Sequence, residues 1–581
     1  MSYASLTAGL WIAAIAVGIF LLLINQICNK RFGKDLEEKN SRCHSISSMR
    51  TRTTSMSSYY ANLDLEKNVE LQSTKKSTHS HQPFLTVVQE EPAVIEDKTS
   101  LIPIIDPRGK DVTEKSKKIF VQQSEDVVSI MSGISRLRAD FFETSNFDPI
   151  GHYKHRTKFA LHFVAQCRAV LNETAIIQNL KNEKFDVMIV ENFDMCGVAL
   201  SHLLQPRSLI TSGAGYPFTY MLEEFGIPLA LSYNPSSFMP HLDVHSMWSR
   251  MKNIYANWLM HYYFHPRRYL IEELYREKFG ADFPSLEEIS SHAAYTLTKS
   301  EPLIDYATPT LTSRIISIPG IGAKQPKALD ESWNAILAQR QKAILISFGS
   351  VAKSVDLPQT LKNSIATVIH RFPDITFIWK YENPEDAFAN ETRASLPNLH
   401  FTSWMPQNDL LSDNRIVAFV THGGMGSTQE TALRGKPGIF VPIFGDQPRN
   451  AGMMEHNGLG KVLDKFDLAN PDKVEAVIRE VLTDKKYAEK SRQVSAMLAK
   501  KPFTSREILV KTVEFAAEFG PSAALRPQSY DMSAVEYHNI DILALTTLIL
   551  VLLAYAVIRS VRWILRSLIT VAIGKAKTKI E

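Results

Sequence analysis

Apolar and polar positions divide the chain into segments of different character. Residues 2–29 form an uncharged apolar run, and a second such run extends from Ile542 to Ile558. Between them, residues 30–95 are rich in Ser, Thr and charged side chains without apolar periodicity, which predicts disorder. From residue 96 onward, short β-branched runs alternate with helical patterns, as expected of an α/β fold.

The α/β part of the sequence divides into two domains. In residues 96–318, strand-like runs occur at "LIPIID", "KIFVQQ" and Phe185–Val190, and a helix is expected through Cys167 and Leu171. Residues 319–330, "PGIGAKQPKALD", have the Gly and Pro content of a linker. Residues 331–520 form the second domain, and we expect the helix after Lys501 to cross back to the first.

A glycine-rich break after a buried strand is the first sign of chemistry. Ile416–Val420 has the composition of a strand buried on both faces, and "THGGMGS" follows it. Ser427–Leu433 then has a helical pattern that stops at Gly435. Free N–H groups and the positive dipole end at a helix N-terminus bind anions, most often phosphate, so we expect His422 to stand beside a phosphate site. The alternative is that the glycines only form a tight turn after the strand and bind no anion.

The next apolar run delivers two more polar residues to the same place. Gly438–Phe444 predicts a neighbouring strand, and Asp446 and Gln447 follow its carboxyl end. In open α/β sheets ligands bind outside the carboxyl ends of the strands. Asp and Gln together supply acceptors and donors suited to sugar hydroxyls.

Taken together, these motifs resemble those of the membrane-bound UDP-glucuronosyltransferase family, from about Leu101 to the C-terminus. "WMPQNDLL", "THGGMGSTQE" and "DQPRN" occur in the family's order, preceded by "AILISFGS" and "FIWKY". The resemblance implies a GT-B fold, with two Rossmann-like domains facing across a cleft and a C-terminal transmembrane helix. It assigns the donor site to Ser350, Lys380, Trp404, Gln407, His422, Gly424, Ser427, Glu430, Asp446 and Gln447.

Each of these assignments has a physical counterpart. Trp404 offers a face on which a base stacks, and Glu430 can accept from ribose hydroxyls. His422, Ser350 and the helix N-terminus stabilise the diphosphate as charge develops on it. The UDP-sugar is a co-substrate, so we expect no cofactor. We expect no metal ion either, because no carboxylates in this half occur at metal-ligand spacing.

The catalytic pair of the family is harder to locate. Family members use a Ser-His loop after the first strand, where the histidine removes the proton of the acceptor. Here "HSHQPFL" offers Ser80 and His81, although the segment before it is a poor strand. Glu191 stands where the family carries a supporting aspartate, at the end of a buried strand. The alternatives are that His81 is a solvated histidine in a tail and that Glu191 is an ordinary loop carboxylate.

Composition and charge limit the class of protein and its partners. The 581 residues are 45% hydrophobic and 22% charged, which is ordinary for globular domains. The formal net charge of +4 lies largely in the terminal regions, which argues against a nucleic-acid partner. Of the four cysteines, only Cys167 and Cys196 are placed to pair, and we expect them to remain unpaired.

The C-terminal apolar run predicts a transmembrane helix over residues 541–558, with a basic cytosolic tail over 559–581. The tail ends in "KTKIE", which resembles a dilysine retrieval signal, so we expect an endoplasmic reticulum membrane protein with a lumenal body. Asn172 and Asn390 each begin a glycosylation triplet, as suits that location. Residues 1–29 are a signal sequence or a membrane anchor. The basic residues after them favour a cytosolic body, opposite to the orientation that the C-terminal helix favours, so the orientation of residues 1–29 stays open.

The sequence therefore predicts an inverting transferase that moves a sugar, glucuronate or glucose, from a UDP-sugar to a hydroxyl of a small lipophilic acceptor, as in detoxification. The alternative is a UDP-sugar-binding pseudoenzyme with an incomplete first domain. A dinucleotide-dependent oxidoreductase is disfavoured, because no G-x-G-x-x-G follows the first strand of either half. The acceptor and the oligomeric state, a homo-oligomer included, are left open.

Overall fold

The structure is a computed structural model that describes residues 84–87, 100–104, 117–121, 140–193, 195–225, 227, 229–306 and 313–577. His81 and the whole of residues 1–29 lie outside the described residues. The chain forms two units, one within Ser80–Tyr530 and one that includes Asp531 onward. The larger unit holds two parallel sheets.

The sheet of the first half has seven strands in the order β3-β2-β1-β4-β5-β6-β7. Every neighbouring pair is parallel. The first six strands follow the doubly wound order, so the topological switch point lies between β1 and β4. The strands are β1 (Phe84–Val87), β2 (Ser100–Ile104), β3 (Lys117–Phe120), β4 (Val187–Glu191), β5 (Ser208–Gly213), β6 (Tyr295–Thr298) and β7 (Ile315–Ser317).

The sheet of the second half repeats this topology with six strands in the order β10-β9-β8-β11-β12-β13. Its switch point lies between β8 and β11, which pair in parallel. All six side chains of β9 are buried, as expected of a strand covered on both faces. The strands are β8 (Lys342–Ser347), β9 (Ile375–Lys380), β10 (Leu399–Thr402), β11 (Ile416–Thr421), β12 (Gly438–Phe440) and β13 (Gly460–Val462).

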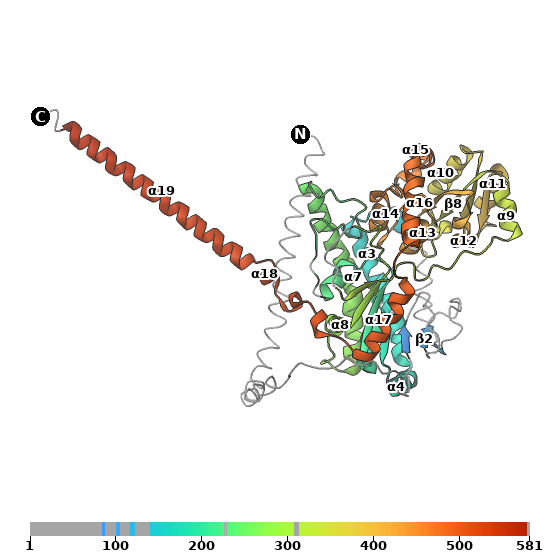
Figure 1. Cartoon of the computed structure of the whole chain (residues 1–581), viewed down its shortest axis with the longest axis horizontal. Helices are drawn as coiled ribbons and strands as arrows, with labels where there is room; N and C mark the ends of the chain where they lie inside the picture. Colours follow the sequence, from blue (N-terminus) through green and yellow to red (C-terminus); the bar gives the residue numbers. More distant parts are fainter. Residues whose placement is uncertain are drawn as a thin grey trace, which may run out of the picture. The chain divides into compact units, whose positions relative to one another are not determined.

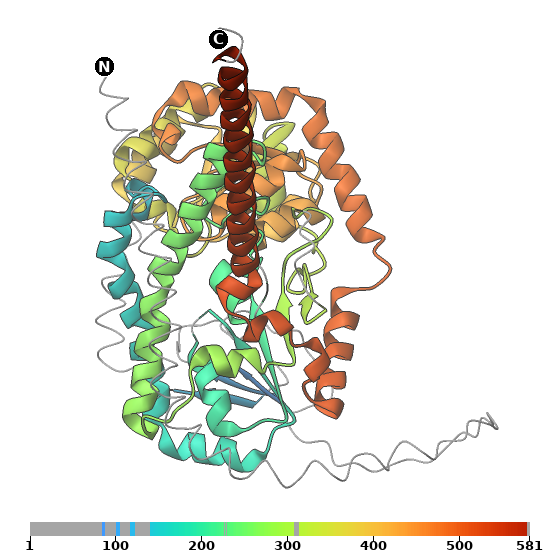
Figure 2. The ribbon, with the colours of Figure 1, turned by 90° about the vertical axis from the view of Figure 1, so that its left-hand side faces the viewer.

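Two long helices dominate the first half. Helices α3 and α7 lie side by side (Figure 2), and α7 is capped by Ser246, whose hydroxyl accepts from the N–H of Ser249. Part of α7 lies in the core, where Leu259, Met260, Tyr263 and Phe264 are buried, whereas Tyr269 is exposed. The helices of this half are α3 (Pro149–Asn172), α4 (Thr174–Glu183), α5 (Cys196–Leu204), α6 (Thr219–Glu224), α7 (Met247–Phe279) and α8 (Leu286–Ser291).

The helices of the second half alternate with its strands, and the last helix returns to the first half. The linker 319–330 contains no helix or strand. Helix α17 packs Leu509, Val513 and Ala516 against the first sheet (Figure 1), which confirms the predicted crossing. The helices are α9 (Glu331–Ala338), α10 (Gln359–His370), α11 (Ala387–Ser395), α12 (Gln407–Ser412), α13 (Met425–Leu433), α14 (Gln447–His456), α15 (Pro471–Thr483), α16 (Lys485–Ala499) and α17 (Ser505–Phe519).

Strand β1 corrects one expectation from the sequence. Residues 30–95 were expected to be disordered, yet Phe84–Val87 is a strand within that range. It pairs with both β2 and β4 and so lies inside the sheet. The physical reason is that "FLTV" is a β-branched and aromatic run, too short to stand out against the polar residues around it.

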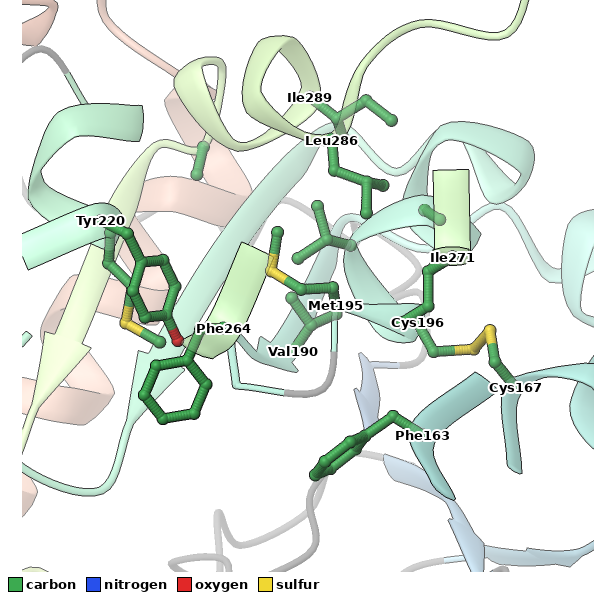
Figure 3. Packing of buried hydrophobic residues seen from close by; sticks show 14 of the residues in the cluster. Phe163, Cys167, Val190, Met195, Cys196, Tyr220, Phe264, Ile271, Leu286 and Ile289 are labelled. Atoms are coloured by element: carbon green, nitrogen blue, oxygen red, sulfur yellow. A yellow bond between two sulfur atoms is a disulfide. The ribbon is translucent and has the colours of Figure 1, made fainter. Parts of the chain in front are cut away.

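The cysteines correct another expectation. Cys167 on α3 and Cys196 at the start of α5 form a disulfide, with Cα atoms 5.5 Å apart (Figure 3). Their separation of 29 residues gave no spacing signal, and only the packing of α3 against α5 brings them together. The disulfide lies in the core of the first half, and Cys167 is 1% exposed.

The smaller unit contains helix α18 (Ala534–Tyr537) and helix α19 (Ile540–Lys577). Among the described residues, Ile540–Thr570 is the one segment long and apolar enough to cross a membrane. Helix α19 continues through Lys577, so most of the range expected to be a separate tail is helical. Its 38 residues correspond to about 57 Å at the usual rise, well beyond the roughly 30 Å of a bilayer core.

The disulfide generates a stability prediction. Replacing Cys167 and Cys196 by Ser should lower the free energy of unfolding by about 3 to 4 kcal/mol, because the cross-link closes a long loop. Thermal unfolding of the intact chain in detergent, with and without reductant, measures this. Reductant should destabilise the native chain and leave the double Ser variant unaffected. Equal melting temperatures for the oxidised and reduced native chain would contradict the disulfide.

Candidate active site

The switch point of the second sheet brings two glycine loops around one histidine. Strands β8 and β11 are in register at Ser347 and Thr421, so Gly349 and His422 leave the sheet side by side. A Cβ on Gly349 would lie 2.6 Å from His422 Cε1, and one on Gly424 would lie 2.5 Å from His422 Nε2. Gly349 also has φ +92°, which strongly favours glycine. Both glycines are therefore required for the imidazole to occupy this place.

The environment keeps His422 neutral. Burial, and then the nearby charge of Lys380, lowers the pKa of His422 to about 4. At neutral pH the ring therefore carries one N–H donor and no charge. Helix α13 begins directly after, with Gly424 at its N-cap and no side chain capping its first turn. The exposed N–H groups of that turn and the imidazole together form a cradle for an anion.

Lys380 supports the cradle from β9. Its Nζ donates to the Gly349 carbonyl at 2.6 Å and lies 3.6 Å from the Glu382 carboxylate. The ammonium also lies 5.4 Å from the centre of the Trp404 ring. Lys380 thus holds the Gly349 loop and the Trp404 side chain in place, while Ser350 stands exposed directly after Gly349.

A second group of predicted residues forms a polar edge beside Trp404. The Gln407 side-chain amide donates to Glu430 at 2.6 Å and to the Ser427 hydroxyl at 3.3 Å. Trp404 is 59% exposed, which leaves its ring available for stacking. The structure therefore brings together Gln407, Ser427 and Glu430, three residues that the resemblance assigned to the donor site.

Asp446 and Gln447 lie at the start of α14, and their side chains have different hydrogen-bond partners. Asp446 Oδ2 accepts from the Asn450 amide at 2.7 Å. The side-chain oxygen Oε1 of Gln447 accepts from the N–H groups of Ile443 at 2.9 Å and Phe444 at 3.1 Å. Half of the Gln447 amide is thus committed to the protein, which the sequence could not indicate.

The two halves approach each other at Asp446. A Cβ on Gly215, which follows β5 in the first half, would lie 3.3 Å from Asp446 Oδ2 and 3.3 Å from Met425 Cε. The carboxyl ends of the two sheets therefore face each other here. The sequence named Asp446 but gave no sign of Gly215, because a lone glycine after a strand is usually only a turn.

On the first-half side, Glu191 emerges at the end of β4 as predicted. Its Oε2 accepts from the N–H of Phe193 at 2.7 Å. Nearby, Arg267 donates to the Tyr220 hydroxyl at 2.8 Å and lies 4.5 Å from the centre of the Phe193 ring. Burial raises the pKa of Tyr220 to about 12, against the opposing charge of Arg267. Sequence reasoning missed Arg267, because Arg267 and Tyr220 are 47 residues apart and no local pattern links them.

The direction of β1 bears on the predicted histidine. Strand β1 runs parallel to β4, with Val87 beside Val190, so the chain reaches the edge that carries Glu191 at the end of β1. His81 precedes Phe84 and lies outside the described residues. The chain between Val87 and Ser100 contains no histidine, whereas the family places its histidine after the first strand.

Among the described residues, no group of three or more His, Cys, Asp or Glu side chains is placed to hold a metal ion. The groups that converge on the cleft are hydrogen-bond donors, carboxylates and an indole. Such a set suits a nucleoside diphosphate joined to a sugar.

The cradle generates a binding prediction. His422→Ala should weaken the binding of UDP by about 10- to 100-fold, which corresponds to the roughly 1.5 to 3 kcal/mol of a hydrogen bond to a charged group. Calorimetric titration of the detergent-solubilised chain with UDP measures the change. His400→Ala is the matched control, because His400 lies on β10 and contacts Gln339 instead. Equal UDP affinity in the native chain and His422→Ala would remove His422 from the diphosphate site.

Comparison with known proteins identifies the family of the chain. The family described as "UDP-glucoronosyl and UDP-glucosyl transferase" matches residues 93–575. The chain is 29% identical over 386 residues to ugt-48 of Caenorhabditis elegans, whose name assigns it to the UDP-glucuronosyltransferases, covering 66% of this chain and 72% of that one. It is 27% identical over 402 residues to human UDP-glucuronosyltransferase 1A10, covering 68% of this chain and 72% of that one.

Among solved structures, a UDP-glucosyltransferase from Polygonum tinctorium is similar at 15% identity and a TM-score of 0.48, over 76% of this chain and 99% of that one. The family match spans most of the sequence and includes every strand of both sheets except β1. The chain belongs to the UDP-glucuronosyl and UDP-glucosyl transferase family and is a UDP-glycosyltransferase with a GT-B fold.

Proposed function

We propose that the protein transfers a sugar, glucuronate or else glucose, from its UDP-sugar to a hydroxyl group of a small lipophilic acceptor, with inversion at the anomeric carbon. The observation that carries this proposal is the approach of Asp446 to Gly215, where the carboxyl ends of both sheets meet. A donor held by the second half would present its sugar at this point to an acceptor held by the first.

The chemistry follows from the groups around the cleft. The acceptor oxygen forms a bond to the anomeric carbon as the bond from that carbon to the UDP oxygen breaks. Negative charge develops on the diphosphate, where the His422 N–H, the first turn of α13 and the Ser350 hydroxyl stabilise it. Trp404 would stack on the uracil, while Gln407, Ser427 and Glu430 would hold the ribose.

The acceptor proton needs a base, and two assignments compete. The first assignment, from the family resemblance, makes His81 the base, with Glu191 as its supporting carboxylate at the first-half edge of the cleft. Because β1 runs toward Glu191 and begins after His81, the chain before Phe84 would have to fold back for that pair to meet. The second assignment makes Glu191 itself the base.

The acceptor side favours apolar compounds. Phe193 lies next to Glu191, and it packs with Phe218 and Phe264 at ring distances of 5.9 and 5.6 Å. Aromatic surface of this kind suits a flat, lipophilic acceptor with one hydroxyl group. It also fits a transferase that takes its acceptors from a membrane.

For location we propose the endoplasmic reticulum, with the catalytic unit in the lumen. The Cys167–Cys196 disulfide fits an oxidising compartment. Helix α19 can anchor the chain, and Arg559, Arg562 and Arg566 follow its uncharged part as expected on the cytosolic side.

A second function, UDP-sugar binding without catalysis, has one observation in its favour. The segment between β1 and β2, residues 88–99, contains no histidine, and the resemblance places the base of the family there. Transfer assays with UDP-glucuronate and UDP-glucose against a panel of phenols, sterols and alcohols decide between the two. Binding of a UDP-sugar without transfer to any acceptor would establish the pseudoenzyme.

The two base assignments make opposite predictions for two variants. If His81 is the base, His81→Ala should lower kcat by about two to four decades and Glu191→Gln should lower it less. If Glu191 is the base, the order is reversed. UDP affinity should stay unchanged in both variants, because the donor belongs to the other half. Full activity in both variants would show that neither residue is the base.

The lumenal location predicts a glycan at one of the two triplets. Asn172 ends α3, and both it and Thr174 are exposed, whereas Asn390 lies in the first turn of α11 and Thr392 is 8% exposed. Expressed with microsomes, the chain should lose mass on glycosidase treatment. Asn172→Gln should abolish that shift, while the matched variant Asn390→Gln should retain it. An unglycosylated chain that added protease digests fully would place the catalytic unit in the cytosol.

A further inference from the structure

Helix α14 carries the sugar-facing Asp446 at its start and contacts the first half through Arg449. The Arg449 side chain is 1% exposed, and its Nη2 lies 2.7 Å from Asp305 Oδ1, which belongs to the first half and is likewise buried. Nη2 also donates to Asn234 Oδ1 at 3.3 Å. The guanidinium carbon lies 3.8 Å from the centre of the Tyr216 ring. One side chain of the donor motif thus joins three sites of the other half.

These partners belong to the part of the first half that faces Asp446. Tyr216 directly follows Gly215, and its hydroxyl accepts from the Asn234 amide at 3.0 Å. The backbone N–H of Arg449 donates to the Ser237 carbonyl at 3.2 Å. The loop that meets Asp446 and the residue that anchors α14 are therefore parts of one connected set of contacts.

The backbones of the two halves also touch one turn further along α14. A Cβ on Gly452 would lie 1.5 Å from the Pro240 carbonyl oxygen. No side chain fits between α14 and the segment from Ser237 to Pro240. The position of α14 relative to the first half is therefore fixed by direct backbone contact as well as by Arg449.

Stability alone does not account for the Arg449–Asp305 pair. Arg449 Nε and Nη1 are buried and have no hydrogen-bond partner. Desolvating two charges is costly, and buried pairs can often be replaced by uncharged residues without loss of stability. What the pair supplies here is a defined geometry, since a planar guanidinium that stacks on Tyr216 and bonds Asp305 admits few arrangements.

We propose that Arg449 is a positioning residue that sets the place of Asp446 relative to the first half, so that the donor sugar is presented to the acceptor only while Arg449 is bonded to Asp305. This inference rests on the proposed function. It assigns to the fourth residue of "DQPRN" a role in aligning the sugar, separate from binding of the nucleotide.

The test uses the paired variant R449M/D305N in the full chain. It removes both charges. The single side-chain oxygen of Asn can still accept from the Tyr306 N–H, and its amide nitrogen, in the place of the other Asp305 oxygen, can donate to the Ser300 hydroxyl. We expect a melting temperature near that of the native chain and UDP affinity within about twofold of it. The affinity for UDP-glucuronate or UDP-glucose relative to UDP, and kcat where transfer occurs, should fall by about 10- to 100-fold, as expected for a misplaced reacting group.

Two further variants separate the effect of an unpaired buried charge from the effect of a lost guanidinium geometry. R449M alone leaves Asp305 buried and unpaired and should be less stable than the paired variant. R449K keeps the charge, so it should retain the fold while losing the planar stack on Tyr216 and part of the sugar affinity. R371M is the matched control, because Arg371 makes a 2.7 Å ion pair with Asp472 inside the second half and should leave the affinity ratio unchanged.

A paired variant with native stability, a native ratio of UDP-sugar to UDP affinity and native kcat would overturn the inference. So would an equal loss of UDP and UDP-sugar affinity, because Arg449 would then only support the nucleotide site. Failure of the proposed function gives a different result. The native chain would bind the UDP-sugar without transferring it, and the affinity ratio would still decide the role of Arg449.

Discussion

The parallel register of β8 and β11 is the constraint on which the site depends. Because Ser347 and Thr421 are paired, the loops after both strands start at the same level, and His422 lies against Gly349 and Gly424. A shift of register would move the imidazole away from the first turn of α13. The anion cradle is thus a product of sheet geometry, and the two glycines are the local condition for it.

The electrostatics of the site follow from that closeness. An imidazolium beside Lys380 in a buried place would be costly, and the lowered pKa of His422 records that cost. The ring acts as a neutral donor, while the positive potential comes from Lys380 and the helix N-terminus. An anion bound against the ring would therefore meet a neutral N–H donor near neutral pH, while Lys380 donates to the Gly349 carbonyl.

The sequence predicted the second half well and the first half less well, for physical reasons. The β11 strand, the glycines and α13 are contiguous, so local composition identifies them together with His422, and the family resemblance adds Glu430. The Cys167–Cys196 disulfide, the bond from Arg267 to Tyr220 and the pair of Arg449 with Asp305 join residues far apart in the chain, which no local pattern reveals. Strand β1 was missed because four residues within a polar stretch carry little periodic signal.

The backbone contact between Gly452 and Pro240 has a consequence for how substrates come and go. Two surfaces that touch without intervening side chains have no compressible layer, so they cannot be pushed closer together. They can, however, rotate about the point of contact. If the cleft widens to release UDP, the motion that costs least is a hinge with its axis near α14, and the far side of the cleft then opens most. Exchange of the nucleotide would be a swing of one half about a fixed pivot.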